Sequence, residues 1–230
     1  MKKWITKHGI TVYRLESPRC NCFAIVTDQE KWLVDTATMH YRNHIKKQLD
    51  ACGIFELTGI ILTHSHINHV EAVAWFAQEY QCPVYVHDSE LHFVQTGDCL
   101  IPNAASPLMH GVEKMVAYIP FLNKYPACRE AKALSFTEPV IWNEYIKLIE
   151  TPGHSEGSIS ILIDEELAIV GDMMKRFGAF HVKLMWANQP GLVEVSWKKL
   201  LQEKCEWFLP SHGREISRKM VEKEVYSQGK

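Results

Sequence analysis

The chain has 230 residues, and 47% of them are hydrophobic, which is enough for a buried core in one large domain or two small ones. Charged residues make up 23% and the formal net charge is −2, so the composition argues against a nucleic-acid-binding surface. No run of about 18 apolar residues occurs, and no apolar segment follows Lys2 and Lys3, so we expect neither a membrane span nor a secretory signal.

Short β-type runs separated by turn residues dominate the first third of the chain. The expected strands cover residues 10–15, 22–27, 31–35 and 58–63. Residues 39–53 predict an amphipathic helix, because the apolar residues share one face and Gly53 is a typical C-terminal stop. A second helix is expected over 70–80 and a further strand over 82–87.

The rest of the chain is expected to begin with an irregular stretch and then return to strands. Residues 88–138 show no clear period apart from helical pieces such as 110–122, and we expect this stretch to be an insertion that frames a cleft. The later strands are expected at 139–150, 158–164, 166–171 and 207–211, and the later helices at 192–204 and 215–227. This order of elements favours one α/β domain over residues 1–230, with helices on the outside.

The cysteines are scattered and odd in number. They are Cys20, Cys22, Cys52, Cys82, Cys99, Cys128 and Cys205, and none of them forms a CxxC pair. This pattern indicates reduced thiols and not a disulfide framework or a zinc ribbon, so we expect a cytoplasmic protein.

The stretch LTHSHINHV, residues 62–70, holds three of the 12 histidines of the chain. His64 and His66 are two residues apart, so in an extended segment both side chains lie on one side and can bind one ion together. His69 comes after the start of the next helix, so it points elsewhere and suits a second ion. Imidazole nitrogens with a few carboxylate oxygens suit zinc, and also iron or manganese.

Other polar motifs also fall where expected strands end. Asp35 follows one strand in VDTA, His154 follows another in TPGHSEGS, Asp172 ends VGD and His212 lies in PSHG. Side chains at strand-to-loop junctions can be pointed by a rigid scaffold into one shared cleft. We therefore expect these residues and the three clustered histidines to form one site.

The series of motifs resembles the metallo-β-lactamase-fold hydrolase superfamily. The resemblance rests on VDT, HxHx(D)H, TPGH, GD and SHG, in this order, and runs from Asn21 to His212. It implies an α/β fold, a four-layer αββα sandwich, with two metal ions in a cleft at one edge. The positions that match the first ion's ligands are His64, His66 and His154, and those that match the second ion's are Asn68, His69 and His212. Asp172 matches a carboxylate that bridges both ions, and Asp35 a buried aspartate that supports the site without ligating.

Asn68 departs from the family pattern, which has an aspartate at this position. Asparagine is neutral, so it cannot act as a base, and the second ion should bind more weakly. Asn68 has a purely structural alternative, because asparagine is a favoured helix N-cap and Glu71 follows three residues later, as in a capping box.

From these residues we expect a hydrolase that uses a metal-bound hydroxide on a small carbonyl substrate, namely an ester, thioester or lactone. Asp172 and Asn68 are the candidate catalytic residues, and the expected cofactors are two divalent ions, zinc first, with iron or manganese as alternatives. The substrate would be anionic if the cations Lys175, Arg176, His181 and Lys183 face the cleft. No nucleic-acid or membrane partner is expected, and a homodimer is left open. Two alternatives remain, a mononuclear iron oxygenase of the persulfide dioxygenase type and a metal-binding protein with little catalysis.

Overall fold

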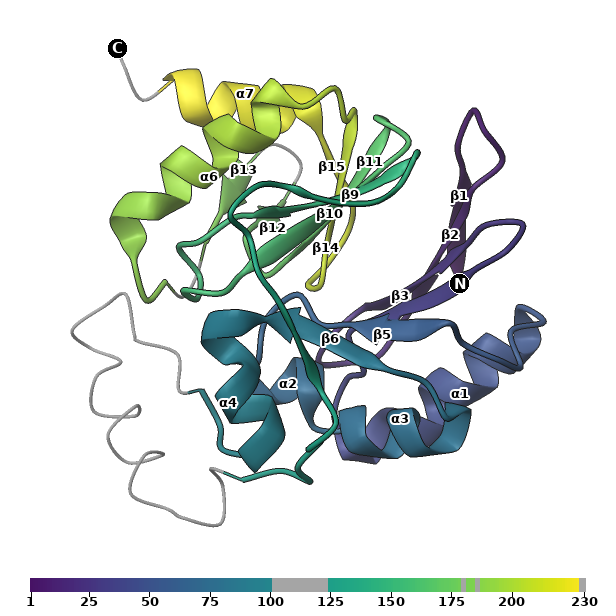
Figure 1. Cartoon of the computed structure of the whole chain (residues 1–230). Coiled ribbons are helices and arrows are strands. Elements are labelled where there is room, and N and C mark those ends of the chain that lie inside the picture. The colour runs from purple at the N-terminus through teal and green to yellow at the C-terminus, as the bar shows by residue number, and fades with distance from the viewer. Residues whose placement is uncertain (101–123, 179–180, 185–186, 228–230) are drawn as a thin grey trace. The chain divides into compact units, whose positions relative to one another are not determined.

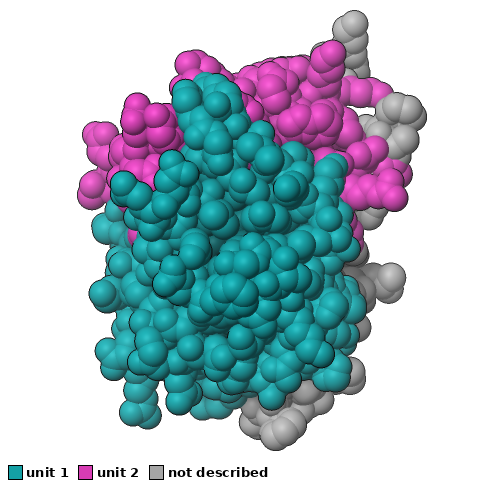
Figure 2. Space-filling view, turned by 90° about the vertical axis from the view of Figure 1, so that its right-hand side faces the viewer, with its two compact units in different colours: residues 1–101, 114–135 teal, residues 102–113, 136–230 magenta. Residues whose placement is uncertain are grey.

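The computed structural model describes residues 1–100, 124–178, 181–184 and 187–227 (Figure 1). The helical piece expected at 110–122 lies outside these residues. The chain divides into two compact units (Figure 2), of which unit 1 comprises Met1–Ile101 and Lys114–Ser135, and unit 2 comprises Pro102–Glu113 and Phe136–Lys230. Within the described residues, no helix is long and apolar enough to cross a membrane.

Unit 1 is built on a seven-stranded sheet in the simple order β1-β2-β3-β4-β5-β6-β7. Its strands are β1 (Lys2–Ile5), β2 (Thr11–Leu15), β3 (Cys22–Val26), β4 (Lys31–Val34), β5 (Gly59–Ile61), β6 (Val84–His87) and β7 (Lys132–Leu134). The pairs from β1 to β4 are antiparallel, and those from β4 to β7 are parallel. Parallel neighbours need long crossovers, and these crossovers carry the helices of unit 1.

The helical elements of unit 1 are η1 (Met39–Tyr41), α1 (Arg42–Ala51), α2 (Ile67–Val70), α3 (Val73–Tyr80) and α4 (Asp88–Thr96). Residues with 0% exposure on three of these elements, Leu49, Val70 and Phe76, join one hydrophobic core with strand residues such as Leu33 and Ile60. The strand β5 is short and fully buried, so the loop that follows it begins from a tightly packed part of unit 1.

The helix α4 and the strand β7 lie in the stretch that we expected to be irregular, so that expectation is wrong for residues 88–96 and 132–134. The helix α4 ends at Gly97, whose φ of +75° is left-handed. A Cβ at this position would lie 2.1 Å from the carbonyl oxygen of Tyr125, so only glycine fits where the two backbones meet.

Unit 2 contains a six-stranded sheet in the order β15-β14-β11-β10-β9-β8 and a separate hairpin, β12-β13. Its strands are β8 (Val140–Asn143), β9 (Ile146–Glu150), β10 (Ile159–Ile163), β11 (Leu167–Gly171), β12 (Lys175–Phe177), β13 (His181–Lys183), β14 (Trp207–Pro210) and β15 (Ile216–Ser217). The helices α6 (Pro190–Gln202) and α7 (Arg218–Ser227) pack on this sheet through residues such as Leu200 and Val221.

The single strand expected over 139–150 is a hairpin, β8 and β9. The side-chain oxygen of Asn143 accepts hydrogen bonds from the backbone N–H groups of Tyr145 and Ile146, both at 2.9 Å, and closes the turn. An Asx turn of this kind reverses the chain in the middle of an apolar run, which hydrophobicity alone does not reveal.

Candidate metal centre

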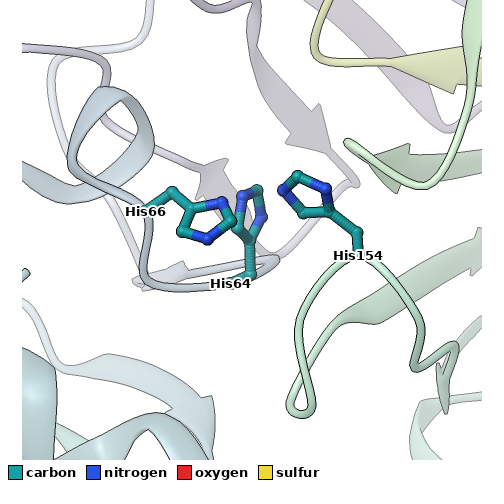
Figure 3. A group of neighbouring side chains, drawn as sticks. All are labelled: His64, His66 and His154. Atoms are coloured by element: carbon teal, nitrogen blue, oxygen red, sulfur yellow. The ribbon is translucent and has the colours of Figure 1, made fainter. Parts of the chain in front are cut away.

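His64 and His66 lie on the loop that joins β5 to α2 (Figure 3). Their side chains are buried, with 1% and 3% exposure. The two ring centroids are 4.7 Å apart with the rings at 89°, and one ring nitrogen of each residue lies within 4.8 Å of the other. His66 has an extended backbone, with φ −65° and ψ 143°. In an extended segment, residues two apart point to the same side, so the imidazoles of His64 and His66 meet.

His69 lies one turn further on, in α2, and its side chain is fully buried against Asp35. The Nδ1 atom of His69 is 2.8 Å from Oδ2 of Asp35. A carboxylate only accepts, so Nδ1 carries the proton and Nε2 keeps its lone pair. This tautomer, held by a carboxylate, is the one in which metal-binding histidines are usually found.

Thr63 connects His64 to the same carboxylate. The hydroxyl of Thr63 donates to Oδ2 of Asp35 at 2.9 Å, and its oxygen lies 3.0 Å from Nδ1 of His64. Because the hydroxyl proton goes to Asp35, the oxygen can accept the Nδ1 proton of His64, which again leaves Nε2 as the lone-pair nitrogen. The donor set of unit 1 therefore fits a divalent ion that prefers imidazole nitrogen.

Asp35 follows β4 with a φ of +58°, a left-handed conformation that is uncommon for residues other than glycine. The next residue, Thr36, donates from both its backbone N–H (2.8 Å) and its hydroxyl (2.9 Å) to the carbonyl oxygen of His69. Backbone strain of this kind persists where surrounding contacts enforce it. Here the turn at Asp35 brings the carboxylate and the α2 segment together.

Asn68 is the second residue of α2, and the N-cap of that helix is His66. The interpretation of Asn68 as an N-cap is therefore wrong. Glu71 does not complete a capping box either, because its Oε2 accepts from the backbone N–H of Met39 at 3.1 Å. Asn68 is half-buried, and its role as a ligand of the second ion stays a prediction.

Unit 2 brings its own three predicted ligands together. His154 is on the loop after β9 (Figure 3), Asp172 directly follows β11, and His212 comes shortly after β14. Oδ2 of Asp172 is 3.6 Å from Nε2 of His154 and 3.2 Å from Nε2 of His212. The strands β11 and β14 are parallel neighbours, so their carboxyl ends meet at one edge, as expected from the strand-end pattern.

The loop that carries His154 packs closely on α6. Gly153 has a φ of +138°, and a Cβ there would lie 2.9 Å from Cγ2 of Val193 in α6. The loop after β11 is held by the same helix, because Nε1 of Trp197 donates to the carbonyl oxygen of Met173 at 2.9 Å. One helix thus supports the backbone beside both His154 and Asp172.

Residues 18–212 match the family model described as the metallo-beta-lactamase superfamily. The chain belongs to this superfamily. It is 28% identical over 154 residues to a probable metallo-hydrolase of Methanocaldococcus jannaschii, with 67% of each chain covered. It is also 25% identical to a probable metallo-hydrolase of Bacillus subtilis. The 211 aligned residues cover 91% of this chain and 89% of the relative.

Solved structures confirm the predicted fold class of this superfamily member. The BLEG-1 B3 metallo-beta-lactamase is similar with a TM-score of 0.70 over 95% of this chain and 100% of that chain, at 18% identity. A metallo-beta-lactamase superfamily protein of Sulfolobus tokodaii is similar with a TM-score of 0.67, over 94% and 85% of the two chains, at 17% identity. At these identities the likeness shows the mixed α/β metallo-β-lactamase fold.

Two residues beside the histidines were not found by the sequence analysis. Thr63 precedes His64 directly, and its position in LTHSH could have suggested a supporting hydroxyl. Cys20 comes from distant sequence, with its Sγ 3.5 Å from Nδ1 of His69. Burial, and then the hydrogen bond with Cys22, raises the pKa of the Cys20 thiol well above its ordinary value, so this sulfur stays a neutral neighbour.

The cations that we expected to select an anionic substrate do not all share one place in unit 2. Arg176 lines a cavity of about 500 Å³ together with Gly178, Gly213 and Arg214. Nε of Arg176 donates to the carbonyl oxygen of Gly178 at 3.1 Å, which holds the guanidinium group in place. Since Gly213 follows His212 directly, two guanidinium groups line a cavity beside a predicted ligand.

His181 and Lys183 have acidic neighbours. His181 lies 3.9 Å from a carboxylate oxygen of Glu224. Lys183 lines another cavity, of about 310 Å³, together with Glu194 and Glu224. Arg176 thus lines a cavity together with a second arginine, Arg214, which the sequence analysis missed because it lies 38 residues later in the sequence.

Proposed function

We propose that this superfamily member is a metal-dependent hydrolase that acts on a small ester, thioester or lactone. The observation that carries the proposal is the hydrogen-bond chain from Asp35 to His69 and, through Thr63, to His64. It fixes the imidazoles in the tautomer that ligates through Nε2. The two relatives described as probable metallo-hydrolases support the reaction class.

In this proposal the first ion is held by His64, His66 and His154. His69, His212 and Asn68 would hold the second ion, and Asp172 would contribute its carboxylate to both. A set of five imidazoles and one carboxylate favours zinc, with iron or manganese as alternatives. Bound ions would supply an ionised water at neutral pH and polarise the substrate carbonyl.

Asn68 and Asp172 would have different roles toward the bound water. Asn68 offers only a neutral carbonyl oxygen or an amide donor, so it orients and does not take a proton. Asp172 is the carboxylate among the proposed ligands and is the group that could take up the proton released when the bound water ionises.

The substitution Asn68→Asp is expected to tighten the second metal site. The change is nearly isosteric, and the new carboxylate adds a negative charge beside a dication. Outer-shell partners of metal ligands are worth about 10–100-fold in affinity or activity, so a direct ligand charge should reach at least about 10-fold in second-metal affinity. Stepwise metal titration of the wild type and the variant, with hydrolysis of one ester measured in parallel, checks this expectation.

Equal affinity for the second ion in the two proteins would show that Asn68 is not a ligand position. Tighter binding without faster hydrolysis would instead indicate that the neutral side chain is adapted to another reaction.

We further propose that the substrate carries a negative charge near its reacting carbonyl. The cavity lined by Arg176 and Arg214 supports this proposal, because guanidinium groups bind carboxylates and phosphates through paired hydrogen bonds. Arg214 is exposed and forms no ion pair with any residue of the part of the chain that the structure describes.

Arg214→Ala is expected to raise the KM for an anionic ester by about 5-fold and to leave a neutral ester of the same shape unaffected. The effect is modest because Arg214 is exposed, and an exposed charge pair contributes about 1 kcal/mol at most. The measurement is hydrolysis of the matched ester pair at low and high salt, with Arg129→Ala, an exposed arginine of unit 1, as the control. An equal change for both esters would contradict the assignment of this cavity to the substrate.

Asn68 is also the observation that favours a second candidate function. A weakened second site is compatible with a mononuclear iron oxygenase that acts on persulfides. One iron per chain, with oxygen consumed in the presence of a persulfide, would support this candidate, whereas two zinc or manganese ions with ester hydrolysis support the hydrolase.

A further inference from the structure

Glu90 is a buried acid that the proposed reaction does not use. It lies in the first turn of α4, and its exposure is 1%. Its Oε2 accepts a hydrogen bond from the backbone N–H of Ser65. Ser65 is the residue between His64 and His66. This contact therefore reaches the centre of the loop between β5 and α2, which we call the histidine loop.

A buried carboxylate is expensive unless its surroundings stabilise the charge. Two features do so here. The N–H of Ser65 donates to it, and the carboxylate lies at the third residue of α4, where the helix dipole favours negative charge. An apolar side chain would fill the same volume without the cost of burying a charge, so packing alone does not explain why a glutamate is buried here.

Two carboxylates, each from the segment that follows a strand neighbouring β5, hold the backbone of the histidine loop. In the sheet, β5 lies between β4 and β6. Asp35, after β4, accepts from the backbone N–H of Thr63 at 2.8 Å. Glu90, in the helix that follows β6, accepts from Ser65. The backbone is therefore fixed immediately before His64 and again between His64 and His66.

We infer that Glu90 is a positioning residue for the pair His64 and His66. By fixing the peptide between them, it sets the directions of both Cα–Cβ bonds and so keeps the two imidazoles able to bind one ion. This inference rests on the proposed metal site, and it assigns to Glu90 a role in metal affinity and not in chemistry. The arrangement follows the general rule that side chains of a metal site work only when a supporting shell fixes their geometry.

The test compares three variants, Glu90→Ala, Glu90→Gln and Asp88→Ala. Glutamine keeps an acceptor oxygen for the N–H of Ser65, whereas alanine removes it. Asp88 is the matched control, because it is an exposed acid in the same first turn of α4. Zinc affinity is measured by competition with a chelator, at a temperature well below the melting temperature of every variant.

We expect Glu90→Ala to weaken the tightest zinc site by about 10–100-fold, the range found for outer-shell partners. Glu90→Gln should restore most of this loss, and Asp88→Ala should bind zinc as the wild type does. Equal losses in Glu90→Ala and Asp88→Ala, or in Glu90→Ala and Glu90→Gln, would overturn the inference while leaving the metal site intact. A wild type that binds no zinc, iron or manganese would refute the proposed function itself.

If Glu90→Ala does not fold, the exchange of the Ser65 amide proton decides the question. We expect this proton to be protected in the metal-free wild type and in Glu90→Gln. Exchange at the rate of an open loop amide in the wild type would overturn the inference.

Discussion

Replacing His66 with alanine is expected to remove the first metal ion and to lower hydrolytic activity by more than about 100-fold, beyond the range of outer-shell changes. The imidazole would be one of three histidine ligands of that ion, beside Asp172, which it would share with the second ion. Without it, the ion would keep two imidazoles and only a carboxylate shared with the second ion, whereas catalytic zinc is typically held by three protein ligands of its own. Metal content of the purified variant, measured together with ester hydrolysis, checks this result.

The control for His66→Ala is His92→Ala, which removes an exposed imidazole from α4. It should retain wild-type metal content and activity. If His66→Ala keeps near wild-type activity with its tightest ion still bound, the assignment of His66 is wrong.

The second large effect is expected at Asp35, on stability as well as on metal binding. Its side chain is 0% exposed and accepts from the backbone N–H of Thr63, from the Thr63 hydroxyl and from Nδ1 of His69. A buried donor left without its acceptor costs about 1–3 kcal/mol, so Asp35→Ala should lower the free energy of unfolding by at least about 3 kcal/mol. Urea unfolding of the metal-free protein measures this loss without the contribution of a bound ion.

The substitution Asp35→Asn distinguishes the contribution of the backbone turn from that of the carboxylate charge. Asparagine tolerates the left-handed conformation of this position about as well as aspartate, so the turn should survive while His69 loses its carboxylate partner. We expect a smaller loss of stability than with alanine and a clearly weaker second metal site. Asp28→Ala, an exposed aspartate of unit 1, should change stability by less than about 0.5 kcal/mol. An Asp35→Ala variant as stable as Asp28→Ala would contradict the role given to this residue.

The elements that carry the site were the easiest to predict from the sequence. The strand β5 is a short apolar run that leads directly into the histidines, and the later strands β11 and β14 end just before Asp172 and His212. In each case a local signal, apolar residues followed by a polar motif, coincides with the tertiary structure.

Other elements were missed because their signals are weak or act at a distance. The helix α4 has no broad apolar face, and its first turn contains Glu90, whose partner Ser65 is 25 residues away. The start of α2 was misplaced because the favoured cap residue Asn68 suggested a later beginning, whereas the extended backbone of His66 begins the helix earlier. Propensity is local, and tertiary contacts overrode it at both places.

The central proposal is a two-metal hydrolase site, and crystallographic anomalous scattering recorded at the zinc, iron and manganese absorption edges tests it most directly. We predict two peaks, one coordinated by His64, His66 and His154 and one by His69 and His212, with Asp172 in contact with both, and the second peak weaker. Peaks at the zinc or manganese edge would agree with the hydrolase. A single peak at the iron edge, or peaks away from these side chains, would contradict it.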